Sequence, residues 1–155
     1  MVRWAGGGQH SHYTVVEFDA MFARTRLNIQ FTARHWVVVN IPAAAILRGD
    51  LSEGQTLTPY AMPGVSLGET HRYMFLLFGQ AAHIDFEPFA GDQWTVPPRM
   101  AWDPFVWAKR HGLGAPLAVQ SMLVPGCMQW GEDNEGRYVA SWGCASDRTD
   151  VRTRV

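Results

Sequence analysis

The stretch Gly68-Glu69-Thr70-His71-Arg72-Tyr73-Met74-Phe75-Leu76-Leu77-Phe78 is the most informative segment of this sequence. Polar residues lead into an apolar run, which predicts a buried strand whose first residues carry the polar chemistry. Because successive side chains of a strand point to opposite faces, His71 and Tyr73 share one face and Arg72 points to the other. We expect these two polar rings to form one wall of a small polar pocket.

Four more segments have the composition of strands. Tyr13–Asp19 is rich in β-branched and aromatic residues, and Asp19 ends it. His35–Ile41 is apolar on both faces, which is typical of a strand that is covered on both sides, and His35 opens it. The two later predicted strands are Leu117–Val124 and Tyr138–Trp142.

Three connections between these segments are predicted to be irregular. Ala20–Gln30 has no clean period and is expected to cross the surface as a loop. Ala43–Leu67 is a long connection interrupted by glycine and proline, and connections of this length often shape the rim of a site. Gly126–Gly136 is expected to be an acidic turn region.

One short helix is predicted late in the chain. Asp103 is a good N-cap, Pro104 suits the first helical position, and Gly112 can adopt the left-handed conformation that ends a helix. Together with five or more strands, this helix predicts an all-β fold, a sandwich of two packed sheets. We expect a single domain over residues 1–146 and a charged tail over residues 147–155.

Composition and charge exclude several classes of protein. Of the 155 residues, 47% are apolar and 17% are charged, which is typical of a globular chain, and the net charge of −1 gives no bulk attraction to nucleic acid. No apolar run reaches the roughly 20 residues that span a bilayer. Cys127 and Cys144 have neither CxxC nor zinc-site spacing, so we expect reduced thiols and predict no metal and no cofactor.

The motifs resemble those of the phosphatidylethanolamine-binding protein family from about Trp4 to Val124. The matching pieces are His35-Trp36-Val37-Val38-Val39-Asn40-Ile41-Pro42, the His71-Arg72-Tyr73 strand and His111-Gly112-Leu113-Gly114-Ala115-Pro116. The resemblance implies a β-sandwich with a small pocket for phosphate-like head groups. Carried over by position, the pocket residues are Asp19, His35, His71 and Tyr73. Protonated imidazoles and a phenol can donate hydrogen bonds to phosphate oxygens.

The sequence also departs from the family pattern. Where the family has Asp-Pro-Asp-x-Pro, this chain reads Asp19-Ala20-Met21-Phe22-Ala23, and the lost prolines leave the turn at the pocket less rigid. The family strand that precedes Trp4 is expected to be missing, which would leave a sheet edge for another segment or chain to cover. Phe75–Gln80 and Ile84–Phe86 resemble the branch of the family found in the large subunit of the mitochondrial ribosome.

Two functions follow from this resemblance. The first is a non-enzymatic structural subunit of a larger assembly, with the mitochondrial ribosome as the first guess, other protein subunits as partners and a mitochondrial location (cytoplasmic in the alternative). RNA is a further candidate partner. The second is a binder of a phosphate or phospholipid head group at an eroded pocket, although the four pocket residues could also persist by hydrogen-bonding one another. The arginines expected to contact a partner or RNA are Arg24, Arg26, Arg34, Arg148, Arg152 and Arg154.

Overall fold

The computed structural model describes residues 10–24, 30–87, 89, 99–132 and 138–142. The chain divides into two compact units, and each is described by itself. The first comprises Met1–Pro63 and His71–Val124, and the second comprises Gly64–Thr70 and Pro125–Val155. The expected tail over residues 147–155 and the positions before Trp4 lie outside the described residues.

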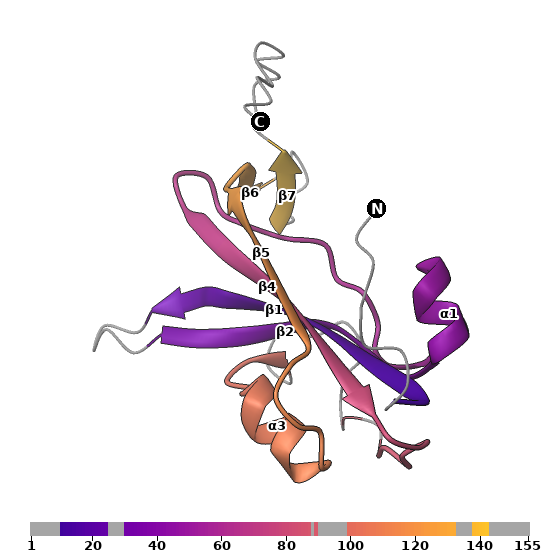
Figure 1. Ribbon diagram of the computed structural model, residues 1–155. Coiled ribbons are helices and arrows are strands. Elements are labelled where there is room, and N and C mark those ends of the chain that lie inside the picture. Colours follow the sequence, from indigo (N-terminus) through magenta and orange to yellow (C-terminus); the bar gives the residue numbers. More distant parts are fainter. Residues whose placement is uncertain (1–9, 25–29, 88, 90–98, 133–137, 143–155) are drawn as a thin grey trace, which may run out of the picture. The chain divides into compact units, whose positions relative to one another are not determined.

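The first unit is built on a five-stranded sheet (Figure 1). The strand order is β3-β2-β1-β4-β5, and β1 pairs antiparallel with both β2 and β4. The predicted all-β class is confirmed, and the described residues of this unit form the predicted late helix, α3, and a second short helix, α1. The elements of this unit are β1 (His12–Arg24), β2 (Gln30–Pro42), α1 (Ala43–Arg48), β3 (Gln55–Thr58), β4 (Thr70–Gln80), α3 (Pro104–Arg110) and β5 (Ala118–Pro125).

The loop predicted over Ala20–Gln30 is wrong at both ends. Strand β1 runs on to Arg24 and β2 begins at Gln30, where these two residues pair. The register shifts three times before that point, between Tyr13 and Val15, between Glu17 and Phe18, and between Asp19 and Ala23. Bulges of this kind interrupt the alternation of side chains, so a strand that contains them shows no clean period in its sequence.

The long connection Ala43–Leu67 contains two elements that were not predicted. Helix α1 follows directly from β2 and ends at Gly49, which has a left-handed φ of 72°. Strand β3 is only four residues long and pairs antiparallel with β2. Both elements are shorter than the window in which hydrophobic periodicity can be recognised, so the sequence pattern could not reveal them.

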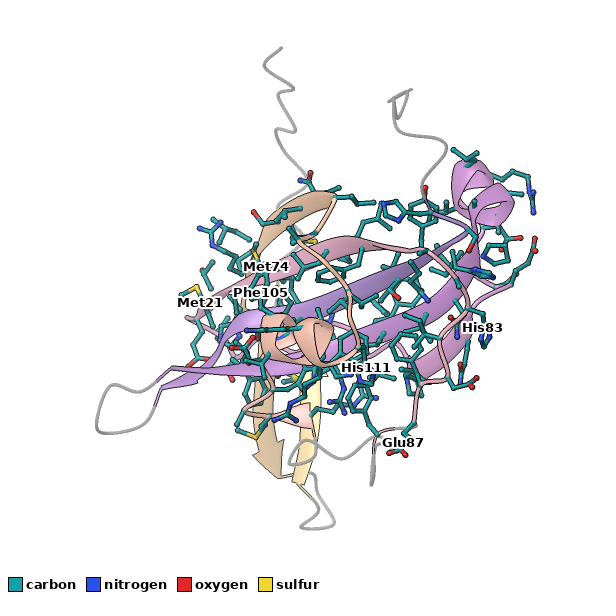
Figure 2. All side chains as sticks on the ribbon, turned by 60° about the horizontal axis from the view of Figure 1, so that its bottom comes forward. Met21, Met74, His83, Glu87, Phe105 and His111 are labelled. Atoms are coloured by element: carbon teal, nitrogen blue, oxygen red, sulfur yellow. The ribbon has the colours of Figure 1, made fainter. Side chains whose placement is uncertain are left out.

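Strand β2 is covered on both faces, as its composition predicted. Val37 and Val39 belong to the larger apolar cluster, whereas Val38 and Ile41 belong to a smaller cluster with Ala45 of α1. The larger cluster includes Trp107 of α3, whose ring stacks on Phe86 at 5.6 Å. Figure 2 shows α3 lying across this face of the sheet, with Phe105 and His111 on the helix.

The predicted ends of α3 are confirmed. The Asp103 side chain accepts hydrogen bonds from the backbone N–H groups of Phe105 and Val106, and Pro104 occupies the first turn. Gly112 has a φ of 67°, in the left-handed region that glycine adopts without strain. The helix is therefore fixed by local sequence at both ends, and its buried Trp107 attaches it to the sheet.

The second unit contains a two-stranded antiparallel sheet of β6 (Met128–Glu132) and β7 (Tyr138–Trp142). Strand β7 was predicted. The prediction of a turn over Gly126–Gly136 is wrong for Met128–Glu132, because these residues form β6. Cys127 forms a disulfide, which corrects the expectation of a reduced thiol, and the chain's other cysteine lies outside the described residues. Pairing depends on the distance between two Cα atoms, which residue spacing alone does not fix.

Candidate functional site

The structure brings together the four predicted pocket residues of the first unit. Asp19 lies on β1, His35 on β2, and His71 and Tyr73 on β4. Asp19 and Tyr73 are direct partners across the β1–β4 pair, so they share a face of the sheet. All four side chains are buried. They form what we call the histidine cluster: Asp19, His35, His71 and Tyr73.

Asp19 holds His71 in place. One carboxylate oxygen, Oδ2, lies 2.6 Å from His71 Nδ1, and the other accepts a hydrogen bond from the backbone N–H of Met21 at 2.8 Å. A carboxylate only accepts, so Nδ1 of His71 carries the proton. The bond to Met21 also fixes the backbone after Asp19, where the register of β1 shifts and where the family pattern has prolines. Asp19 therefore acts as a positioning residue for the imidazole.

His35 is the second imidazole of the cluster. Its Nδ1 donates to the carbonyl oxygen of Ala61 at 2.9 Å, because a carbonyl can only accept. Its ring meets the Tyr73 ring edge to face, with centroids 4.9 Å apart. Burial lowers the pKa of His35, although the Ala61 bond and the Asp19 charge act in the opposite direction. The ring is therefore mostly neutral at pH 7, with Nε2 as an acceptor.

Sequence reasoning did not identify Arg99, which lies beside this cluster. Its side chain is buried, and its two terminal nitrogens donate to the carbonyl oxygens of His35 and Pro59, each at 3.1 Å. The guanidinium charge also contributes to lowering the pKa of His35. In the sequence, Arg99 follows Pro97 and Pro98 and belongs to no periodic pattern of apolar residues, so no sequence signal placed it near His35.

Glu17 is the second residue that sequence reasoning did not select. It lies two positions before Asp19 on β1 and is completely buried. Neither carboxylate oxygen has a hydrogen-bond partner among the residues that the structure describes. Burial raises the pKa of Glu17 from 4.5 to about 7. Strand alternation puts Glu17 on the face of Asp19, but alternation alone does not show whether that face is covered.

The arginines predicted to contact a partner fall into two groups. Arg34 is buried: its Nε donates to the Thr58 hydroxyl at 2.7 Å, and its guanidinium lies 3.5 Å from the centroid of the Phe89 ring. It packs inside the fold, which corrects its expected place at the surface, because a bulge turned it toward the core side of β2. The second group lies outside the described part of the chain and consists of the side chain of Arg24 and the residues Arg26, Arg148, Arg152 and Arg154.

In the described ranges, no group of three histidine, cysteine or acidic side chains is arranged to hold a metal ion. None of the described helices is long and apolar enough to cross a membrane.

Comparisons with known proteins give consistent results. Residues 3–121 match the family model described as phosphatidylethanolamine-binding protein. A rice (Oryza sativa subsp. japonica) relative, "Protein MOTHER of FT and TFL1 homolog 2", is 34% identical over 87 residues, covering 55% of this chain and 44% of the relative. The "26 kDa secreted antigen" of Toxocara canis is 31% identical over 110 residues, covering 70% of this chain and 40% of the relative.

The similarity extends to solved structures. The solution structure of CG7054 has a TM-score of 0.53 and 30% sequence identity, and the match covers 81% of this chain and 69% of that one. The chain spans less than half the length of each of these two curated relatives. The similarity therefore supports the fold and the family of this chain. It does not assign the functions of the full-length relatives to it.

Proposed function

The chain belongs to the phosphatidylethanolamine-binding protein family, and from this premise we propose that it binds a small phosphate-bearing ligand at the histidine cluster. The observation that carries the proposal is the buried Asp19–His71 pair with His35 and Tyr73 beside it. Four polar side chains from three strands are gathered on one face of the sheet. The cluster contains no serine, threonine or cysteine, which favours binding without catalysis.

The protonation of the two imidazoles determines how an anion would bind. His71 is held by Asp19, so the charge of a protonated His71 is balanced within the pair. His35 uses Nδ1–H for Ala61, so its Nε2 can donate to a phosphate oxygen only when the ring is protonated. Because burial lowers the pKa of His35, the ring must take up a proton from solvent when phosphate binds. We expect phosphate affinity to rise as the pH falls below neutrality.

The test is an NMR titration of the full chain with inorganic phosphate, following the imidazole resonances. His71→Gln removes the imidazole held by Asp19 and is expected to weaken binding by about tenfold or more, the scale of one charge-assisted hydrogen bond. His83→Gln is the matched control, because the His83 side chain is 59% exposed and lies outside the cluster. Phosphate-induced shifts that are equal in both variants would show that the cluster is not the site.

A second candidate function is attachment to a larger assembly. Strand β5 lies at the edge of the described sheet, and Val119 and Leu123 on it are 54% and 56% exposed. Phe105 of α3 is 53% exposed. Apolar side chains on an edge strand favour contact with another chain. The partners would be protein subunits, with RNA contacts through Arg24 and Arg26.

The assembly suggested by the sequence resemblance is the large subunit of the mitochondrial ribosome, which would place the protein in mitochondria. Gentle affinity purification from cells, followed by sizing and mass spectrometry, tests this candidate. Co-migration with a megadalton particle would support it. A single peak at the 17.4 kDa mass of the chain would count against it and leave ligand binding as the function to pursue.

A further inference from the structure

Strand β5 forms one edge of the sheet in the first unit. It is hydrogen-bonded to β4, and no other described strand pairs with its outer edge. None of its eight residues is buried among the described part of the chain, whereas β4 beside it has buried residues along its length. An edge strand of this kind presents backbone N–H and C=O groups to a further strand.

Neighbouring residues of β5 show that both of its faces are open. Met122 and Leu123 follow each other along the strand, so their side chains point to opposite faces of the sheet, and both are exposed. Val119 is exposed as well. A partner that packs on one face of the sheet would leave the apolar side chains of the other face in water. A strand that pairs with the edge contacts side chains on both faces.

Strand β5 lacks the features by which edge strands usually avoid pairing. Charged side chains and prolines within the strand are the common protections. The eight residues of β5 carry no charge, and the single proline, Pro125, is the last of them. An uncharged, exposed and apolar edge strand is typical of a strand that pairs with another chain.

The surroundings of β5 are cationic. Arg72 Nη1 lies 3.5 Å from the Ser121 hydroxyl, which belongs to the middle of β5. Lys109 and Arg110 are exposed in the last turn of α3, the helix that precedes β5 in the chain. Strands β4 and β5, helix α3 and the turn that joins α3 to β5 contain no acidic residue. The charge beside this edge therefore has a single sign.

We propose that β5 is the docking site for an extended segment of a partner protein that is both acidic and apolar, and that this segment adds to the sheet as a strand next to β5. Backbone hydrogen bonds to the edge would supply affinity, and the exposed side chains of β5 would select apolar residues. The cations beside β5 would select carboxylates and speed association. The inference rests on the second candidate function, attachment to a larger assembly, and names the kind of partner.

The charges favour an acidic partner over a second copy of this chain. A second copy that paired through its own β5 would bring an uncharged strand with the same cations beside it, and like charges would then face each other across the new pair. RNA would satisfy the cations and leave the apolar side chains of β5 without a partner. An acidic and apolar protein segment matches both properties of the edge.

The test is an NMR titration of the full chain with a synthetic peptide that has two glutamates at each end and alternating valine and threonine between them. We expect this peptide to shift the backbone amide resonances of β5 and to bind more weakly as the salt concentration rises. The same peptide with lysine in place of glutamate should bind at least about tenfold more weakly. A version with a central proline, which interrupts strand pairing, should give no shift.

Two variants separate the apolar and the electrostatic contributions. Leu123→Asp removes an exposed apolar side chain and adds a negative charge, so it should weaken peptide binding at least about tenfold. Its matched control is Leu47→Asp, the same change at a leucine of α1 that is 73% exposed. Arg72→Gln should weaken binding and reduce its salt dependence, whereas Arg48→Gln, at an exposed arginine of α1, should do neither.

Several results would overturn the inference. One is an acidic peptide that does not shift the β5 resonances, or that loses affinity equally in Leu123→Asp and Leu47→Asp. Another is complete protection of the β5 amides from hydrogen exchange in the free chain, because the edge would then already be occupied. Dimers that Leu123→Asp abolishes, without peptide binding, would assign the edge to a second copy. Oligouridylate binding that requires Arg72 and not Leu123 would assign it to RNA.

The inference and the assembly candidate fail separately. Peptide binding at β5 by a chain that elutes from cells as a single small species would keep the docking site and remove the large assembly as its partner. Co-migration with a large particle that persists in Leu123→Asp would keep the assembly and overturn β5 as the point of attachment. Co-migration that is lost in Leu123→Asp and retained in Leu47→Asp would uphold both.

Discussion

Replacing Glu17 with Gln should stabilise the protein by an amount that grows as the pH rises from about 4.5 to about 7. The carboxyl is buried without a hydrogen-bond partner among the described residues, and burial raises its pKa from 4.5 to about 7. The folded state therefore binds this proton more tightly than the unfolded state does. Between these two pKa values the stability falls as the pH rises, because folding must then remove a charge from water. Gln has nearly the same shape and carries no charge.

The expected size of the effect follows from the two pKa values. The difference between about 7 and 4.5, at about 1.4 kcal/mol per pH unit, corresponds to roughly 3 kcal/mol at pH values above 7. Below a pH of about 4.5 both side chains are neutral in both states, and the gain should vanish. A gain of this size would raise the melting temperature of a domain of this length by roughly 6–12 °C.

Urea denaturation of the wild type and Glu17→Gln at about pH 4.5, 6 and 8 measures this prediction. The difference in the free energy of unfolding should grow with pH, from near zero to about 3 kcal/mol. Glu53→Gln is the control, because Glu53 is an exposed carboxylate and its removal should have a small effect at every pH. A difference between the wild type and Glu17→Gln that does not change with pH would refute the reasoning.

Two further predictions concern the scaffold of the site. Gln80→Leu removes the amide whose oxygen accepts from the Thr14 hydroxyl at 2.7 Å and from the Asn40 backbone N–H at 3.0 Å, and leaves these two donors without that acceptor. It should lower the free energy of unfolding by about 2–4 kcal/mol, measured by urea denaturation, and a loss below about 1 kcal/mol would show that water replaces the amide. Asp103→Ala removes the cap of α3 and should cost about 1 kcal/mol, whereas Asp103→Asn should retain most of the stability. Equal losses in both Asp103 variants would contradict the capping role.

Much of the scaffold could be predicted from local sequence. Alternation in the stretch Gly68–Phe78 placed His71 and Tyr73 on one face, and both are buried on that face of β4. The capping preferences of Asp103, Pro104 and Gly112 predicted where α3 begins and ends. These features depend on neighbours within a few residues, so propensity and periodicity are sufficient to find them.

The fold around the site was less accessible to sequence reasoning. Arg34 was expected at the surface, yet it is buried against Phe89. The register shift after Glu17 pairs Phe18 with Arg34 and leaves His35 on the side of Tyr73. A one-residue shift reverses the face of every later side chain, and no residue in this strand signals the shift.

The sequence by itself determined the all-β class, the family and the identity of the four residues of the histidine cluster. Only the tertiary structure decided that Asp19 holds His71, that Arg99 lies behind His35, and that Glu17 is buried among aromatic rings. The first set depends on short-range patterns of apolar and polar residues. The second depends on which strands are neighbours and in which register, because burial and the pKa values that follow from it are set by residues distant in the chain.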